Sequence, residues 1–81
     1  MGRFYYTYVL QSSKDDKFYI GWTVDLKSRV QKHNKGLIDS TKYRNPLKLV
    51  YFEGCLSKKQ AIIREKQLKT GFGRKYLKSR V

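Results

Sequence analysis

Cysteine, histidine and proline are scarce in this sequence of 81 residues, with a single copy of each, and only six side chains are acidic. The lone Cys55 cannot form an internal disulfide. The single His33 has no Cys or His partners at the spacing of a zinc ligand set. A disulfide-stabilised scaffold and a zinc module are therefore excluded, and Cys55 is interpreted as a small apolar filler.

Long hydrophobic runs are also missing. No stretch approaches the roughly 20 consecutive apolar residues that a membrane-spanning helix needs. The opening residues 1–6 have neither the apolar stretch of a secretory signal nor the Ser or Thr at position 6 that a myristoylation site requires. We therefore expect a soluble, cytoplasmic protein.

Basic side chains are present in large excess. Nineteen Lys or Arg face the six acids, which gives a formal charge of +13 and a pI near 10.1. A disordered tail is not expected, because 40% of the residues are hydrophobic and 15% are aromatic. The length predicts one compact domain over residues 1–81, and the charge makes a polyanion, above all nucleic acid, the leading partner.

The positive charge is concentrated in residues 57–81, which hold nine Lys or Arg and a single acid, Glu65. A solubilising surface and an anionic membrane are the competing explanations. The final stretch 74–81 has too few apolar residues for a membrane-surface helix, so no membrane partner is expected. The basic residues taken as nucleic-acid contacts are Lys58, Lys59, Lys66, Lys69, Arg74 and Lys75.

Residue patterns predict three strands and three helices. The strands cover 4–10, 17–22 and 47–52, where β-branched and aromatic residues gather between turn-forming segments. A first helix with Thr23 as its N-cap ends near Gly36, a second follows Ser57 over 58–70, and a third covers 74–81 after Gly71 and Gly73. The order β-β-α-β-α-α predicts an α+β domain with helices over a three-stranded sheet.

The first two strands are expected to form a hairpin. A loop over 12–15 would pair Gln11 with Asp16 and would place Tyr8 opposite Tyr19. Opposed residues of an antiparallel pair share a face, so both hydroxyls would point to the same side of the sheet.

Glu65 is the most informative anomaly of the second helix. Ala61, Ile62 and Leu68 define the apolar face of this helix, and Glu65 falls near the middle of it. A carboxylate at such a position needs a partner, because desolvating an isolated charge costs several kcal/mol. Two interpretations stay open: a salt bridge at the rim with Lys69, four residues on, or a site for a cation.

Arg29 and His33 lie four residues apart and share one side of the first helix. The planar fork of an arginine suits a phosphate, and a histidine can orient a water, a tyrosine hydroxyl or a phosphate. Taken singly, each has a structural alternative as a surface or satisfied residue. Tyr8 and Tyr19 likewise have the alternative of packing in the core.

Together these positions resemble a known family. Tyr8 within the Tyr-Thr-Tyr-Val-Leu segment 6–10, the Tyr-Ile-Gly tripeptide 19–21, Arg29, His33 and Glu65 are similar in type and spacing to the GIY-YIG nucleases. The resemblance extends over about residues 4–69. The segment 44–51 looks like the small stand-alone bacterial branch.

The resemblance implies an antiparallel sheet with flanking helices and cleavage of phosphodiesters that depends on Mg²⁺ or Mn²⁺. The substrate would be nucleic acid, with DNA favoured over RNA, and the branched or damaged DNA of repair and recombination is one candidate. Tyr8 or Tyr19 would help to activate the attacking water, Arg29 would bind the phosphate, His33 would support proton transfer, and Glu65 would bind the metal. Mg²⁺ keeps several waters and completes its shell with substrate phosphate, which suits a site with one carboxylate.

Two physical expectations accompany these roles. A tyrosine acting as a base needs a pKa below its usual value of about 10, and either the Arg29 cation or the water network of the metal is expected to lower it. Gly21 is expected to let a phosphate backbone approach, because it has no side chain.

Departures from the family pattern keep an alternative open. Tyr6 stands where the first half-motif has glycine, and the late Asn of many family nucleases has no counterpart after Asn45. The DNA-binding module of the larger enzymes is also not seen. The alternative is a non-catalytic nucleic-acid-binding module, and a separate targeting protein could supply specificity.

Overall fold

A computed structural model describes residues 3–81. Met1 and Gly2, part of the segment read for targeting signals, lie outside the described residues. The elements follow the expected order of α+β type. They are β1 (Tyr5–Ser12), β2 (Phe18–Thr23), α1 (Leu26–Asn34), β3 (Leu47–Cys55), α2 (Lys58–Leu68) and α3 (Gly71–Lys78).

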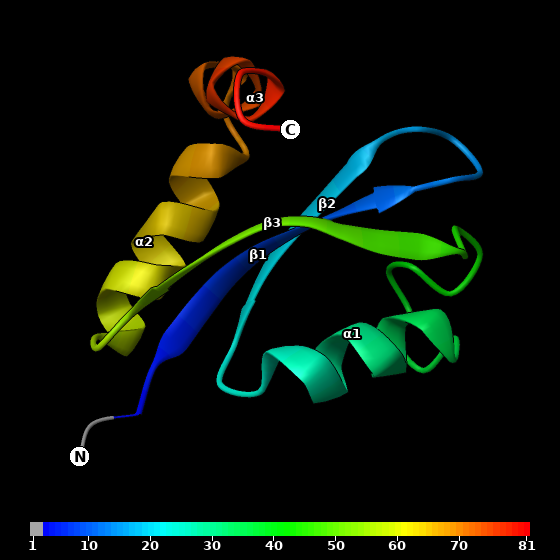
Figure 1. Ribbon diagram of the computed structural model, residues 1–81, viewed down its shortest axis with the longest axis horizontal. Helices are drawn as coiled ribbons and strands as arrows, with labels where there is room; N and C mark the ends of the chain where they lie inside the picture. The colour runs from blue at the N-terminus through cyan, green and yellow to red at the C-terminus, as the bar shows by residue number, and fades with distance from the viewer. Residues whose placement is uncertain (1–2) are drawn as a thin grey trace.

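The three strands form one antiparallel sheet in the order β2-β1-β3, with helices on both faces (Figure 1). Residues of the central strand β1 alternate between two cores. Val9 packs with Ile20, Leu68 and Leu77 beneath α2 and α3. Tyr8 and Leu10 face α1, where the other members of the cluster are Leu26, Val30 and Leu47.

The hairpin register differs from the predicted one by two residues. Tyr8 pairs with Gly21, and Tyr19 pairs with Leu10. The predicted pairing of Tyr8 with Tyr19 is wrong because the turn is longer, running from Ser12 to Lys17. A shift of two residues keeps every side chain on its face, so Tyr8 and Tyr19 still point to the α1 side of the sheet.

Gly21 is required by this register. A Cβ at this position would lie 2.6 Å from the hydroxyl oxygen of Tyr8. The space that the missing side chain leaves is thus filled by the Tyr8 ring and is not open to a phosphate.

The N-cap of α1 is Asp25, two residues later than predicted. Its carboxylate accepts a hydrogen bond from the backbone N–H of Ser28 at 3.1 Å. Thr23 ends β2, and its hydroxyl accepts from the N–H of Asp25. Both side chains are competent caps, and β2 ends one residue later than predicted, at Thr23, so the helix starts downstream.

The third helix begins earlier than predicted, at Gly71, with Thr70 as its N-cap. The two glycines therefore lie in the first turn of α3 and do not separate it from α2. Gly73 marks close helix contact, since a Cβ there would lie 2.4 Å from the Cα and carbonyl oxygen of Leu68. Within residues 3–81, no helix is long and apolar enough to cross a membrane.

The loop that follows α1 is fixed at both ends. Gly36 has a positive φ of 75°, which glycine adopts without strain. The Asn34 amide binds both backbone groups of Leu47, accepting from its N–H and donating to its carbonyl, each at 2.8 Å. Residues 35–46 are thereby held beside the α1 face of the sheet.

Candidate active site

Tyr8, Arg29 and His33 meet on the α1 side of the sheet. The hydroxyl of Tyr8 lies 2.8 Å from Nε2 of His33, and Nε of Arg29 donates to the same hydroxyl at 3.4 Å. Tyr8 and His33 are fully buried, whereas Arg29 is half-buried. The two residues of α1 thus converge on a single phenol from the central strand, as the spacing of Arg29 and His33 predicts.

The donors and acceptors in this chain follow from the chemistry of each group. Arg29 can only donate, so the Tyr8 oxygen accepts from it, and the Tyr8 hydrogen is available for Nε2 of His33. In a neutral imidazole the other nitrogen, Nδ1, then carries the hydrogen. Nδ1 lies 2.7 Å from Oγ1 of the buried Thr41, which accepts it.

His33 is held in its neutral form. Burial, helped by the positive charge of Arg29, lowers the pKa of His33 from 6.5 to about 4. The ring is therefore neutral at physiological pH, with Nε2 free to accept from Tyr8.

The pKa of Tyr8 is raised above its usual value, contrary to the expectation from Arg29. Burial is the largest cause and outweighs the hydrogen bond and the charge of Arg29, which act in the opposite direction. Tyr8 is consequently a neutral phenol. It can take a proton from water only if it passes its own proton on, and His33 is the adjacent acceptor.

Tyr19 belongs to the same cluster. Its ring centroid lies 5.0 Å from that of His33 and 6.4 Å from that of Tyr8. The hydroxyl of Ser40 donates to the Tyr19 hydroxyl at 3.4 Å. Ser40 and Thr41, neighbours in the loop after α1, therefore support one catalytic candidate each, and sequence reasoning missed both.

Glu65 projects from α2 with 17% of its side chain exposed, between the buried residues Ala61 and Leu68. Its negative charge makes the smallest contribution to the raised pKa of Tyr8. Lys69 lies 3.3 Å from Glu65, and the salt bridge foreseen from the sequence is therefore present.

The fit of a metal rests on this one carboxylate. Within the part of the chain that the structure describes, no group of three or more His, Cys, Asp or Glu could hold an ion. Mg²⁺ commonly binds through one or two carboxylates plus waters and substrate phosphates. Glu65 fits that mode, with the phosphate of a bound substrate completing the shell.

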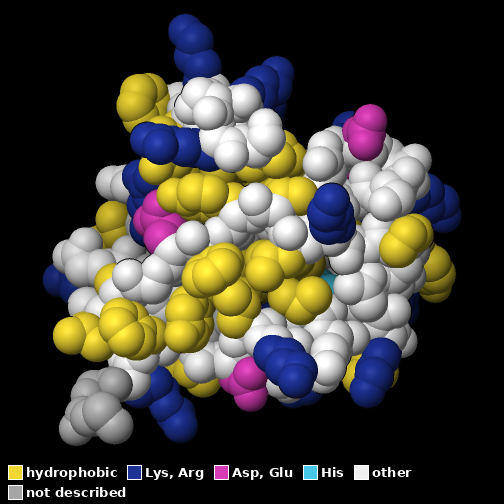
Figure 2. All heavy atoms as spheres, in the orientation of Figure 1, with side chains coloured by type: hydrophobic (Ala, Val, Ile, Leu, Met, Phe, Trp, Pro, Cys, Tyr) yellow, Lys and Arg dark blue, Asp and Glu magenta, His cyan; other side chains and the backbone are white. Residues whose placement is uncertain are grey.

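The basic residues predicted to contact nucleic acid are all exposed, and Figure 2 shows Lys and Arg around the periphery of one face. Lys69 and Arg74 line a groove beside β2. Lys58 lies over the ring of Trp22, with its nitrogen 5.3 Å from the centroid. Outside the groove lie Lys59, Lys66 and Lys75.

Comparison with known proteins agrees with this geometry. The family model described as the GIY-YIG catalytic domain matches residues 4–77. A UPF0213 protein of Clostridium perfringens is 43% identical over 65 residues, which cover 79% of this chain and 69% of that protein. A UPF0213 protein of Staphylococcus saprophyticus is 39% identical over 75 residues, covering 91% of this chain and 90% of that protein.

A solved structure extends the likeness to three dimensions. The solution NMR structure of a UPF0213 protein of Bacillus halodurans matches with a TM-score of 0.58 at 30% identity. The match covers 94% of this chain and 83% of that one. A GIY-YIG domain indicates nuclease-like activity on nucleic acid. The chain belongs to the GIY-YIG family, and within this family it is similar in sequence to the UPF0213 proteins.

Proposed function

We propose that the protein is an endonuclease that hydrolyses phosphodiester bonds of DNA with the help of Mg²⁺ or Mn²⁺. The observation that carries the proposal is the hydrogen-bonded chain from Arg29 through Tyr8 to His33. The buried phenol and the neutral imidazole place a proton donor and a proton acceptor 2.8 Å apart, which is the geometry that proton transfer requires.

Each residue takes a role that its contacts support. Tyr8 accepts a proton from the attacking water as it gives its own proton to Nε2 of His33. Arg29 donates a hydrogen bond from Nε to the Tyr8 hydroxyl, and the two terminal nitrogens of its guanidinium group suit the negative charge of a phosphate. Tyr19, bonded to Ser40 and not to His33, is assigned to positioning the substrate.

Glu65 is the residue that would hold the metal. When bound, the ion supplies stabilisation of the charge that develops on the phosphoryl oxygens. The carboxylate lies beside a cation, Lys69, that can release it and bind a phosphate instead. Before substrate binds, the ion pair with Lys69 therefore balances the negative charge of Glu65.

The same ion pair favours the alternative function. With Glu65 held by Lys69, the protein would be a nucleic-acid-binding module that retains the fold without turnover. Such a module would bind DNA with a steep dependence on salt and would show no cleavage stimulated by metal.

A cleavage assay separates the two functions. End-labelled single-stranded, duplex, flapped and branched DNA is incubated with the protein and Mg²⁺, Mn²⁺ or a chelator. We expect metal-dependent cleavage that falls at least about 100-fold in Tyr8→Phe and Glu65→Gln, in line with the size of general acid-base effects. Asp39→Asn is the charge-matched control, because the Asp39 carboxylate is 99% exposed in a surface pair with Lys42.

Two results would overturn the proposal. Cleavage at the wild-type rate by Glu65→Gln or Tyr8→Phe would show that these residues are not the site. Binding without metal-stimulated cleavage of any substrate would establish the binding module instead.

A further inference from the structure

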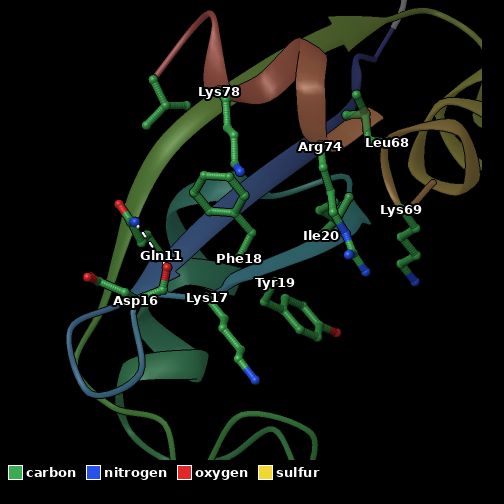
Figure 3. Close-up of a pocket in the computed structure, with 11 residues that line it drawn as sticks. Gln11, Asp16, Lys17, Phe18, Tyr19, Ile20, Leu68, Lys69, Arg74 and Lys78 are labelled. Carbon is green, nitrogen blue, oxygen red and sulfur yellow. Dashed lines mark hydrogen bonds between the residues drawn. The ribbon is translucent and has the colours of Figure 1, made fainter. Parts of the chain in front are cut away.

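A groove of about 960 Å³ lies between the edge strand β2 and the C-terminal helices (Figure 3). Ile20 and Leu68 contribute apolar surface, and Phe18 lies among the lining side chains. The groove is on the α3 side of the sheet, whereas the Tyr8 and His33 cluster is on the α1 side. It is therefore a separate surface that meets the candidate site only along the edge of β2.

Four cations line this groove: Lys17, Lys69, Arg74 and Lys78. They come from three parts of the chain and are exposed, and Asp16 is the single acidic side chain among the lining residues. In Figure 3, Lys69 and Arg74 extend from the helical side toward the open space beside Tyr19. An excess of cations from several elements suits a polyanion that contacts them in succession.

Phe18 adds an aromatic ring to the lining of the groove. Its ring is half-buried against the core that underlies α3, and it lies beside Lys78 in the groove (Figure 3). Proteins that bind single strands combine a positive groove for the backbone with aromatic rings on which bases stack. Within a duplex the base faces are covered by their neighbours, so a ring in the groove is useful only for unpaired bases.

The groove reaches the candidate active site at two residues. Tyr19 lines the groove and also packs edge-to-face against His33, with 5.0 Å between the two ring centroids. Lys69 lines the groove and pairs with Glu65 at 3.3 Å. A strand lying in the groove would therefore pass beside the proposed phosphate and metal positions at the edge of β2.

We propose that the groove between β2 and α3 binds one unpaired strand of nucleic acid, either free or as the single-stranded arm of a branched DNA. That the bound strand is a substrate rests on the proposed nuclease function. That the strand binds in the groove is tested without cleavage.

The experiment measures binding by fluorescence anisotropy in a chelator, with the full chain, a labelled 20-nucleotide thymidine strand and a blunt duplex of the same length. We expect the single strand to bind at least about tenfold more tightly than the duplex. Phe18→Leu should lose about tenfold for the single strand, because stacking contributes about 1–3 kcal/mol per base, and should leave duplex binding unchanged. Phe18→Trp keeps a ring and should retain the binding.

A matched pair on α3 tests the cations. Lys78 lines the groove and Lys75 does not, and both are exposed residues of the same helix. Lys78→Gln should weaken binding of the single strand more than Lys75→Gln, although each removes one charge. Thermal unfolding by circular dichroism checks that every variant is folded.

Several outcomes would overturn the proposal that the groove binds a single strand. These are equal affinity for strand and duplex, unchanged binding by a folded Phe18→Leu variant, or equal losses in Lys75→Gln and Lys78→Gln. If the protein cleaves DNA but gives one of these contradictory binding results, the nuclease function is supported and single-strand binding in the groove is not. If the predicted binding is found without any cleavage, single-strand binding in the groove is supported and the nuclease function is not.

Discussion

At the residue scale, Thr41 is the hydrogen-bond partner of the second ring nitrogen of His33. Its hydroxyl lies 2.7 Å from Nδ1 and accepts the hydrogen there when Nε2 accepts from Tyr8. Without a partner at Nδ1, the hydrogen can move to Nε2 and face the Tyr8 hydroxyl. Thr41 is thus a positioning residue that acts through His33.

Thr41→Val is expected to slow cleavage at least about tenfold, because Nδ1 of the imidazole loses its hydrogen-bond partner and the Nδ1–H tautomer loses that stabilisation. It should also reduce the free energy of unfolding by about 1–3 kcal/mol, the range for a buried polar group left without a partner. Thr41→Ser keeps the hydroxyl and should restore the rate. Nitrogen chemical shifts of the His33 ring report the tautomer directly, and a ring unaltered by Thr41→Val would contradict the assignment.

His33 should also make stability depend on pH. Its pKa is about 4 in the folded protein against 6.5 for the ordinary group, so between these values only the unfolded chain is protonated. Stability therefore falls as the pH is lowered from about 6.5 to 4. The loss from this group is about 3 kcal/mol, at roughly 1.4 kcal/mol per pKa unit.

Urea unfolding of the wild type and of His33→Gln at pH 7, 5.5 and 4 checks this prediction. The variant lacks the titration, so its stability should fall less over this range. Parallel pH dependences for the two proteins would show that burial of His33 has no such effect.

At the element scale, α3 owes its position to Gly73. The backbone of Leu68 at the end of α2 occupies the place where a side chain would project from Gly73. Tyr76 of α3 also makes cation–π contacts with two guanidinium groups, Arg64 at 4.9 Å and Arg80 at 5.0 Å from its ring centroid. These contacts fix the helix that carries Arg74 and Lys78 into the groove.

Gly73→Ala should destabilise the protein by about 1–3 kcal/mol, because the added methyl group meets backbone that cannot rotate away. Gly71→Ala is the control from the same helical turn, since a Cβ there has no neighbour within 4 Å. It should be neutral or stabilising by up to about 1 kcal/mol. Equal urea midpoints for the two variants would show that α2 and α3 are not in the described contact.

At the scale of the whole molecule, the basic residues behind the +13 charge are unevenly distributed. Four of the nineteen basic residues line one groove, and many of the others are spread over exposed surface. The general charge favours any polyanion, whereas the groove sets where a strand lies. The edge of β2 joins this groove to the tyrosine and histidine cluster on the opposite face.

Binding of a single strand should weaken steeply with salt. If the four groove cations each displace a counterion from a phosphate, the slope of log K against log salt is about −3. Lys78→Gln should reduce this slope by about 0.7, and Lys75→Gln should change it less. Anisotropy titrations at increasing KCl measure the slopes, and a slope near zero would exclude phosphate binding in the groove.

Much of the architecture was predictable because it depends on local patterns. The Ser57 cap of α2, the apolar face carrying Ala61 and Leu68, and the strand order along the chain all follow from capping and periodicity. The common face of Tyr8 and Tyr19 was predicted despite the wrong register, since a shift by two residues preserves the face.

The sequence by itself determined the family, the fold class and the residue types of the candidate site. Only the tertiary structure decided the proton chemistry and the groove. The pKa of His33 and that of Tyr8 depend on burial, and Tyr8 meets its acceptor across 25 positions of chain. Thr41, Phe18 and Lys78 gain their proposed roles in the same way, because the packing of distant segments, and no local pattern, sets their neighbours.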